Sequence, residues 1–182
     1  MFSRLILAGL LLAAAAASAH QHGNASPRLS RAPKAFAVER ALPPPPRDVS
    51  ELRFGDIFKL PAGPRGLEAG ERLADLDGKR VRLVGYMVQQ EQSGNGAFVL
   101  SPLPLTLGDA DEGLADDMPP AAVLVELPGQ AALSPAHMPG LIQVTGRLHV
   151  GRSESEALPG RVFPARVELD PRLTKILVRA NK

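Results

Sequence analysis

Cysteine and tryptophan are absent from this 182-residue chain, and aromatic residues are scarce, with six Phe and one Tyr. The absence of cysteine excludes disulfides, a thiol nucleophile, a thiolate metal site and an N-terminal cysteine that carries a lipid anchor. The fold must therefore be stabilised by the burial of apolar side chains. The scarcity of aromatic rings disfavours a surface on which nucleic-acid bases stack.

The chain also lacks the short motifs of common enzyme classes, since no G-x-S-x-G, H-E-x-x-H or P-loop pattern occurs in it. Ser101 and Ser134 have no base near them in the sequence, and His137 and His149 each lack a second histidine at a ligand spacing. We expect both histidines to be surface residues. Catalysis is therefore the weaker class of hypothesis for this protein.

Residues 1–19 have the pattern of a secretory signal peptide. Arg4 provides a positive charge, residues 5–16 are apolar, and Ala17-Ser18-Ala19 is the small-x-small pattern that signal peptidase recognises. The apolar run is shorter than the roughly 20 residues that a membrane-spanning helix needs, and no second run reaches that length. We expect the mature chain to begin at His20, without a transmembrane segment, in a bacterial periplasm or outside the cell.

Residues 20–49 have little periodicity and contain the run Pro43-Pro44-Pro45-Pro46, which favours an extended polyproline II structure. We expect a disordered Pro-rich leader here, before a domain at residues 50–182. Within that domain, residues 67–133 are acidic and residues 134–182 are basic. A basic tail can bind nucleic acid or anionic lipid. The favoured interpretation is that both segments form solvent-exposed surfaces whose opposite charges offset each other.

After a short helix expected at residues 50–58, the pattern becomes period two, which is typical of half-buried strands. The expected strands are residues 79–89, 97–100, 121–127, 141–150 and 162–169, with a last short strand at residues 174–178. Residues 121–127 are almost wholly apolar, as in a central strand. Gly85 and Gly146 are expected to bend two of the strands. These features predict a mainly β fold, a small five-stranded barrel.

Two of these segments resemble strands of the oligonucleotide/oligosaccharide-binding (OB) fold, a small Greek-key barrel. They are GKRVRLVGY at residues 78–86 and LIQVTGRL at residues 141–148. The wider arrangement, with GLE at residues 66–68 and ADDMPP at residues 115–120, resembles small uncharacterised secreted bacterial proteins. That resemblance covers residues 54–170 and implies an OB-like β-barrel and an exported location, without known chemistry.

Outward positions of two expected strands carry the residues best suited to binding: Arg82, Tyr86, Thr145, Arg147 and His149. Tyr86 is the one ring on this face that could stack on a ligand. We therefore expect a non-catalytic binding or adaptor module of the bacterial cell envelope, whose partner is an envelope protein or a small ligand and which needs no cofactor. Binding of nucleic acid or oligosaccharide through the same face is the third candidate function.

The expected mature N-terminus, His20-Gln21-His22, supports a different function. A free α-amine, two backbone amides and the imidazole of a third-position histidine form the square-planar nitrogen set that Cu(II) and Ni(II) prefer. The second candidate is therefore a periplasmic Cu(II)- or Ni(II)-binding protein with His20 and His22 at its metal site. The alternative interpretation is a polar terminus whose histidines have no metal role.

A cluster of carboxylates in residues 108–120 resembles the start of a calcium-binding loop. Its members are Asp109, Asp111, Glu112, Asp116 and Asp117. Pro120 stands at the twelfth position, where such a loop needs its closing Glu. The favoured interpretation is a solvated loop whose charge protects a neighbouring edge strand from aggregation.

A protein that starts at His20 is expected to bind one Cu(II) ion with a violet, tetragonal spectrum. His22→Ala removes the third-position imidazole, and one additional residue before His20 displaces the free amine, so each change is expected to abolish that spectrum. Visible absorption during titration with Cu(II) measures the binding. Copper binding that survives both changes would place the site elsewhere.

Overall fold

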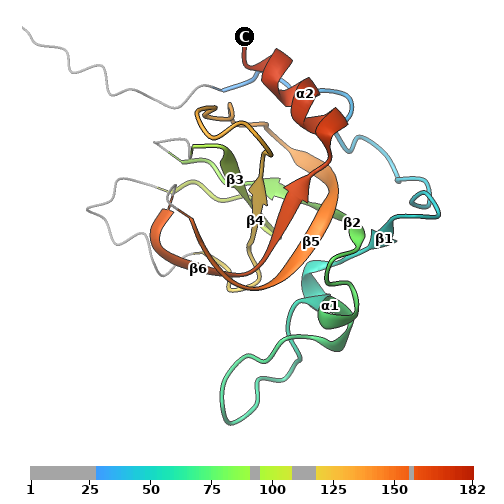
Figure 1. Ribbon diagram of the computed structural model, residues 1–182, viewed down its shortest axis with the longest axis vertical. Coiled ribbons are helices and arrows are strands. Elements are labelled where there is room, and N and C mark those ends of the chain that lie inside the picture. Colours follow the sequence, from blue (N-terminus) through green and yellow to red (C-terminus); the bar gives the residue numbers. More distant parts are fainter. Residues whose placement is uncertain (1–27, 91–94, 108–117, 156–157) are drawn as a thin grey trace, which may run out of the picture.

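Figure 1 shows the computed structural model, which describes residues 28–90, 95–107, 118–155 and 158–182. Its strands are β1 (Ser50–Glu51), β2 (Arg80–Met87), β3 (Ala97–Ser101), β4 (Val123–Glu126), β5 (Leu141–Ser155) and β6 (Leu158–Leu169). Its helices are the 3-10 turn η1 (Phe54–Asp56), α1 (Glu71–Asp75) and α2 (Pro171–Ala180). The mainly β prediction is confirmed. Residues 50–58, expected to be one short helix, contain β1 and η1 instead.

The six strands form one mixed sheet in the order β1-β2-β3-β4-β6-β5, and β5 also pairs with β2. The β2–β5 pairing is antiparallel over seven residue pairs, from Arg80 opposite Arg147 to Tyr86 opposite Leu141. The pairings therefore return to β2 and join β2, β3, β4, β6 and β5 in a closed ring. Within the described residues the sheet has six strands rather than the expected five, because β1 pairs in parallel with β2 outside this ring.

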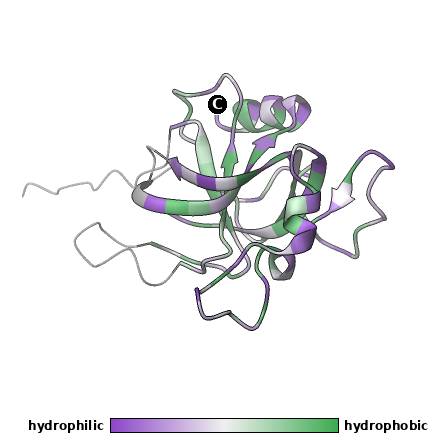
Figure 2. Cartoon of the chain, turned by 60° about the horizontal axis from the view of Figure 1, so that its bottom comes forward, coloured by the Kyte–Doolittle hydropathy of each residue, from purple (hydrophilic) through white to green (hydrophobic). Residues whose placement is uncertain are grey.

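Alternate residues of the ring point inward and form the main core. On β2 and β5 the fully buried members are Val81, Leu83, Ile142, Val144 and Leu148. A second core lies on the other side of β3 and β4, where Val99 and Leu124 pack with Leu107 and Met118. Every residue of β3 is therefore buried. In Figure 2 the hydrophobic colour follows the strands through the middle of the molecule, as these two cores require.

Gly85 and Gly146 lie where another strand's backbone comes very close. A Cβ atom at Gly146 would lie 2.1 Å from the carbonyl oxygen of Glu168, and a Cβ atom at Gly85 would lie 2.6 Å from that of Ser101. Non-bonded heavy atoms prefer separations of roughly 3.5 Å or more, so both positions require glycine. The two glycines singled out in the sequence therefore permit close contacts between strands of the ring.

The expected strand at residues 174–178 is wrong, because these residues belong to helix α2. Asp170 is the N-cap residue and Pro171 is the first residue of the helix, a position that tolerates proline. Thr174 and Leu177 are buried, and their spacing of three is that of one helix face. The packing of α2 on the main core thus outweighs the preference of its β-branched residues for a strand. No helix in the described parts of the chain is long and apolar enough to cross a membrane.

The expectation of a disordered leader at residues 20–49 is wrong for residues 28–49, which pack against the ring. Phe36 is fully buried in the main core, and Ala32 and Val49 are also buried. We call residues 28–49 the N-terminal segment. Residues 20–27, with both histidines of the expected copper site, lie outside the described residues.

Backbone hydrogen bonds hold the N-terminal segment on β5. The Gln143 N–H donates to the Phe36 carbonyl oxygen at 2.7 Å, and the Val38 N–H donates to the Leu141 carbonyl oxygen at 3.0 Å. This edge of β5 is free because its pairing with β6 begins only at Gly146. The buried side chain of Phe36 and this short edge pairing thus hold on the ring a segment whose composition favours extended, unpaired structure.

Phe36→Ala is expected to lower the free energy of unfolding by about 3–5 kcal/mol, because it removes a buried aromatic ring and leaves a cavity. Leu60→Ala is the control, since Leu60 is 76% exposed and its truncation should change stability by less than about 0.5 kcal/mol. Urea melts followed by circular dichroism measure both. Equal effects of the two substitutions would show that the N-terminal segment is not part of the core.

Candidate functional site

The register between β2 and β5 determines how the five expected binding residues are arranged. Arg82 lies directly opposite Thr145, and Arg147 lies opposite Arg80. Tyr86 is four residues from Arg82, which corresponds to about 13 Å along a strand. His149 is two residues beyond Arg147 on β5, where its Nε2 lies 3.4 Å from a Glu168 carboxylate oxygen. The five residues therefore follow one face, but only Arg82 and Thr145 are neighbours at its centre.

Arg82 does not face solvent, contrary to the expectation from the alternating pattern. Its side chain is 8% exposed, Nη1 donates to the Pro43 carbonyl oxygen at 2.8 Å, and Nη2 donates to Glu51 at 3.3 Å. The N-terminal segment covers it, and the guanidinium holds that segment and β1 against β2. Arg82 is thus a structural contact rather than an open binding residue.

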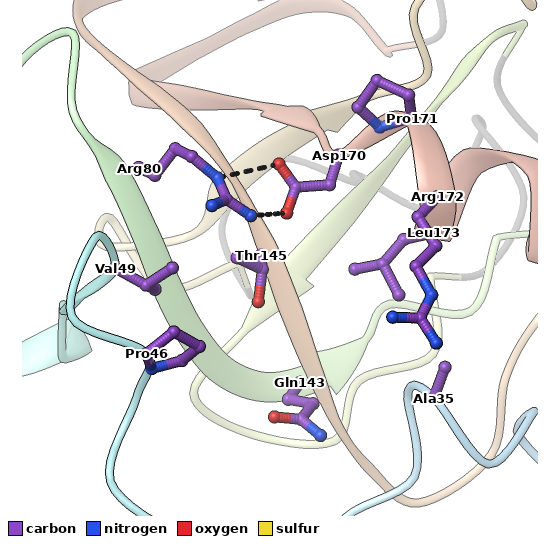
Figure 3. A pocket seen from close by; sticks show the side chains of 10 residues that line it. All are labelled: Ala35, Pro46, Val49, Arg80, Gln143, Thr145, Asp170, Pro171, Arg172 and Leu173. Atoms are coloured by element: carbon purple, nitrogen blue, oxygen red, sulfur yellow. Dashed lines mark hydrogen bonds and ion pairs between the residues drawn. The ribbon is translucent and has the colours of Figure 1, made fainter.

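Thr145 borders a cavity of about 620 Å³ on the outer face of β2 and β5. Figure 3 shows its lining: Arg80, Gln143 and Thr145 from the two strands, Ala35, Pro46 and Val49 from the N-terminal segment, and Asp170, Pro171, Arg172 and Leu173 from the start of α2. We call it the α2 pocket. Its volume lies within the range of roughly 300–1,000 Å³ that is typical of small-molecule sites.

The Arg80 guanidinium is neutralised at one side of the α2 pocket. Nη2 donates to one Asp170 oxygen at 2.6 Å and Nε donates to the other at 3.3 Å, while Nη1 donates to Asp48. The hydrogen bonds with Asp170 raise the pKa of Arg80 further above its ordinary value, so it stays charged. Because Asp170 is bound in this way, its side chain does not cap α2.

Arg172 contributes the other positive charge of the α2 pocket. Its side chain extends from the first turn of α2 across the cavity toward Ala35 (Figure 3). Arg172 is exposed, and its guanidinium has no hydrogen-bond or ion-pair partner within the parts of the chain that the structure describes. Gln143 and Thr145 add an amide and a hydroxyl to the same cavity. The site therefore combines one uncompensated cation with neutral hydrogen-bonding groups.

A second cavity, of about 470 Å³, lies over β4 and β6 and carries more acidic residues. Glu154 and Glu168 border it, and Arg166 donates to Glu126 there at 2.5 Å. Across the described residues, no group of three or more His, Asp or Glu side chains is placed to hold a metal ion. The acidic residues 109–117, considered as a calcium loop, lie outside the residues whose structure is described.

Thr145 was predicted from the sequence as a site residue, but most of the α2 pocket was not. Arg80 was assigned to the right strand, yet its partner Asp170 is 90 residues away. Arg172 was missed because it was assigned to no element, and residues 174–178 of the helix that carries it were expected to form a strand. The sequence Asp170-Pro171, an N-cap residue followed by a proline suited to the first helical position, was the signal that could have revealed α2.

His137 is half-buried beside the N-terminal segment rather than on the open surface. Its Nε2 lies 3.1 Å from the Met87 carbonyl oxygen, which can only accept, so this nitrogen carries the proton. Burial lowers the pKa of His137 below its ordinary value of 6.5, the bond with Met87 opposes that shift, and the charge of Arg28 adds to it. The ring is therefore neutral at pH 7.

No protein-family model matches the chain, and no curated protein matches it. Among solved structures, a DUF3299-family protein from Pseudomonas aeruginosa is similar, with a TM-score of 0.42 and 18% sequence identity. The alignment covers 66% of this chain and 91% of that protein. Secretion and the OB-like description of the ring stay predictions.

Acid is expected to destabilise the protein through His137. The unfolded chain protonates His137 near pH 6.5, whereas the folded chain binds this proton only at lower pH. Proton uptake by the unfolded state therefore lowers the free energy of unfolding as the pH falls below 6.5. His137→Gln keeps a donor for the Met87 carbonyl but does not titrate. Urea melts between pH 7.5 and 5.5 should show a smaller loss of stability in the variant. An unchanged pH dependence would contradict this role of His137.

Proposed function

We propose that the protein is an exported, non-catalytic binding module that holds a small ligand in the α2 pocket. The observation that carries this proposal is the cavity itself, which opens on the outer face of β2 and β5 and includes Thr145. Half of its lining residues are apolar and the rest are a few polar groups, as in sites that bind small molecules. The signal-peptide pattern of residues 1–19 supports export to the bacterial envelope.

The chemistry of the α2 pocket favours binding over catalysis. Asp170 is the one carboxylate among the described residues of its lining, and both of its oxygens accept hydrogen bonds from Arg80. A carboxylate engaged in this way is a poor general base, because its charge is already stabilised. Thr145 therefore has no base beside it in the pocket lining that could activate its hydroxyl.

The pairing pattern supports an OB-like barrel as the scaffold of this module. The ring contains five strands, and β4 and β6 are parallel neighbours within it, whereas its other pairs are antiparallel. A small closed ring of this kind suits the Greek-key barrel of the OB fold. The second and third strands of an OB barrel, which often bind oligonucleotides, correspond here to β3 and β4. Their outer face is covered by the second core, which argues against the nucleic-acid candidate.

Ala35→Trp is expected to abolish ligand binding, because Ala35 lines the α2 pocket and an indole ring there occupies part of it. Ala41→Trp is the matched control, since Ala41 is exposed on the same segment and does not line the pocket. Saturation-transfer NMR against a defined mixture of small carboxylates, amines, alcohols, sugars and nucleotides measures binding.

The parent protein and Ala41→Trp should bind at least one compound of the mixture that Ala35→Trp does not bind. Thermal melts confirm that the variants are folded. Absence of any bound compound, or binding that is equal in Ala35→Trp, would argue against a ligand site in the α2 pocket.

A further inference from the structure

The charges in the lining of the α2 pocket indicate which class of ligand it takes, an inference that rests on the proposed binding function. Three charged side chains border the cavity: Arg80, Asp170 and Arg172. Arg80 and Asp170 neutralise each other through two hydrogen bonds. The Arg172 guanidinium has no partner in the described parts of the chain, and it extends over the cavity (Figure 3). Among the described lining residues, Arg172 is therefore the charged group without a counter-ion.

We propose that the α2 pocket binds a small organic monoanion, a carboxylate with a short apolar body, and that Arg172 binds its carboxylate group. A guanidinium presents parallel N–H donors that match the two oxygens of a carboxylate. Gln143 and Thr145 lie on the floor of the same cavity, where their amide and hydroxyl add neutral donors. The carboxylate would thus complete a site whose protein groups are mainly donors.

The apolar body of the ligand has a place among the apolar residues that line the same cavity. Ala35, Pro46, Val49 and Leu173 all border the cavity, and Val49 is buried. A short hydrocarbon chain that leaves water for these side chains gains free energy in proportion to its buried area. A fully polar ligand such as a sugar would leave these four side chains without matching contacts.

The electrostatics also exclude two other classes of ligand. A cationic ligand would meet the unpaired Arg172, and the one carboxylate of the lining is already bound by Arg80. A dianion such as a phosphate monoester would bring a second negative charge close to Asp170, and the Arg80 charge that could balance it is shared between Asp170 and Asp48. A single negative charge is what the lining accommodates.

Three probes of equal size and different charge test the ligand class: butanoate, butylamine and butanol. Each is titrated into the full mature protein while amide chemical shifts are followed by NMR. Butanoate should shift the amides of Gln143, Thr145 and Leu173, whereas butylamine should not, and butanol should do so only weakly. Butylamine or butanol binding in the pocket as tightly as butanoate would overturn the proposed ligand class.

Arg172→Gln should weaken butanoate binding about fivefold or more, because it removes a charge-assisted hydrogen-bonding partner. Arg172→Lys keeps the charge and should retain part of the affinity. Arg179→Gln is the matched control, since Arg179 is exposed two turns further along α2 and does not line the pocket. Equal affinities in the parent protein and Arg172→Gln would overturn the role of Arg172.

The outcomes separate this inference from the proposed function. If other compounds bind the parent protein and are lost in Ala35→Trp while butanoate does not bind, the pocket is a ligand site but its ligand is not a short carboxylate. If neither butanoate nor any compound of the mixture binds, both proposals are wrong. Butanoate binding that needs Arg172 and is absent in Ala35→Trp supports both.

Discussion

The antiparallel pairing of β2 with β5 is the constraint on which the rest of the structure depends. Its seven residue pairs join β5, the last strand of the order, to β2 and close the ring. The same register directs Val81 and Val144 into the core and leaves Arg80 and Thr145 on the outer face. Both the hydrophobic core and the floor of the α2 pocket follow from this one alignment, because a shift of one residue would exchange the two faces.

Much of the outer surface of this ring is covered by other parts of the chain. The second core covers β3 and β4, and the N-terminal segment covers Arg82. The α2 pocket is one place where the cover is incomplete, between the N-terminal segment and the start of α2. Arg80 joins these parts, since its guanidinium contacts Asp48 of the segment and Asp170 of the helix cap. The shape of the pocket is therefore linked to the packing of both elements.

The strands could be predicted because period-two alternation is a local property. Accordingly β2, β5 and β6 overlap the strands expected at residues 79–89, 141–150 and 162–169. Gly85 and Gly146 were also recognisable as special positions, although the close contacts that require them are not local. Arg82 could not be placed correctly, because its partner carbonyl is on Pro43, 39 residues earlier. The same limit applies to Phe36, a single aromatic residue in a Pro-rich segment, whose burial depends on the edge of β5. Thr145 was identified as a site residue because strand alternation places it on the outer face. Arg172 could be identified only by recognising α2 as a helix.

The hydrogen bonds between the N-terminal segment and β5 also have a consequence for the order of folding. Phe36 and β2 both depend on residues 141–147, more than 50 positions further along the chain. The loop-closure entropy of these contacts must be overcome before they contribute stability, so the ring is expected to form slowly and late. A nascent chain that has been synthesised only as far as β4 has an unpaired edge on β2 and an unburied Phe36. This partly folded state is the one most prone to aggregation. The appearance of β5 therefore provides the partner of both β2 and the N-terminal segment, and β6 then closes the ring by pairing with β4 and β5.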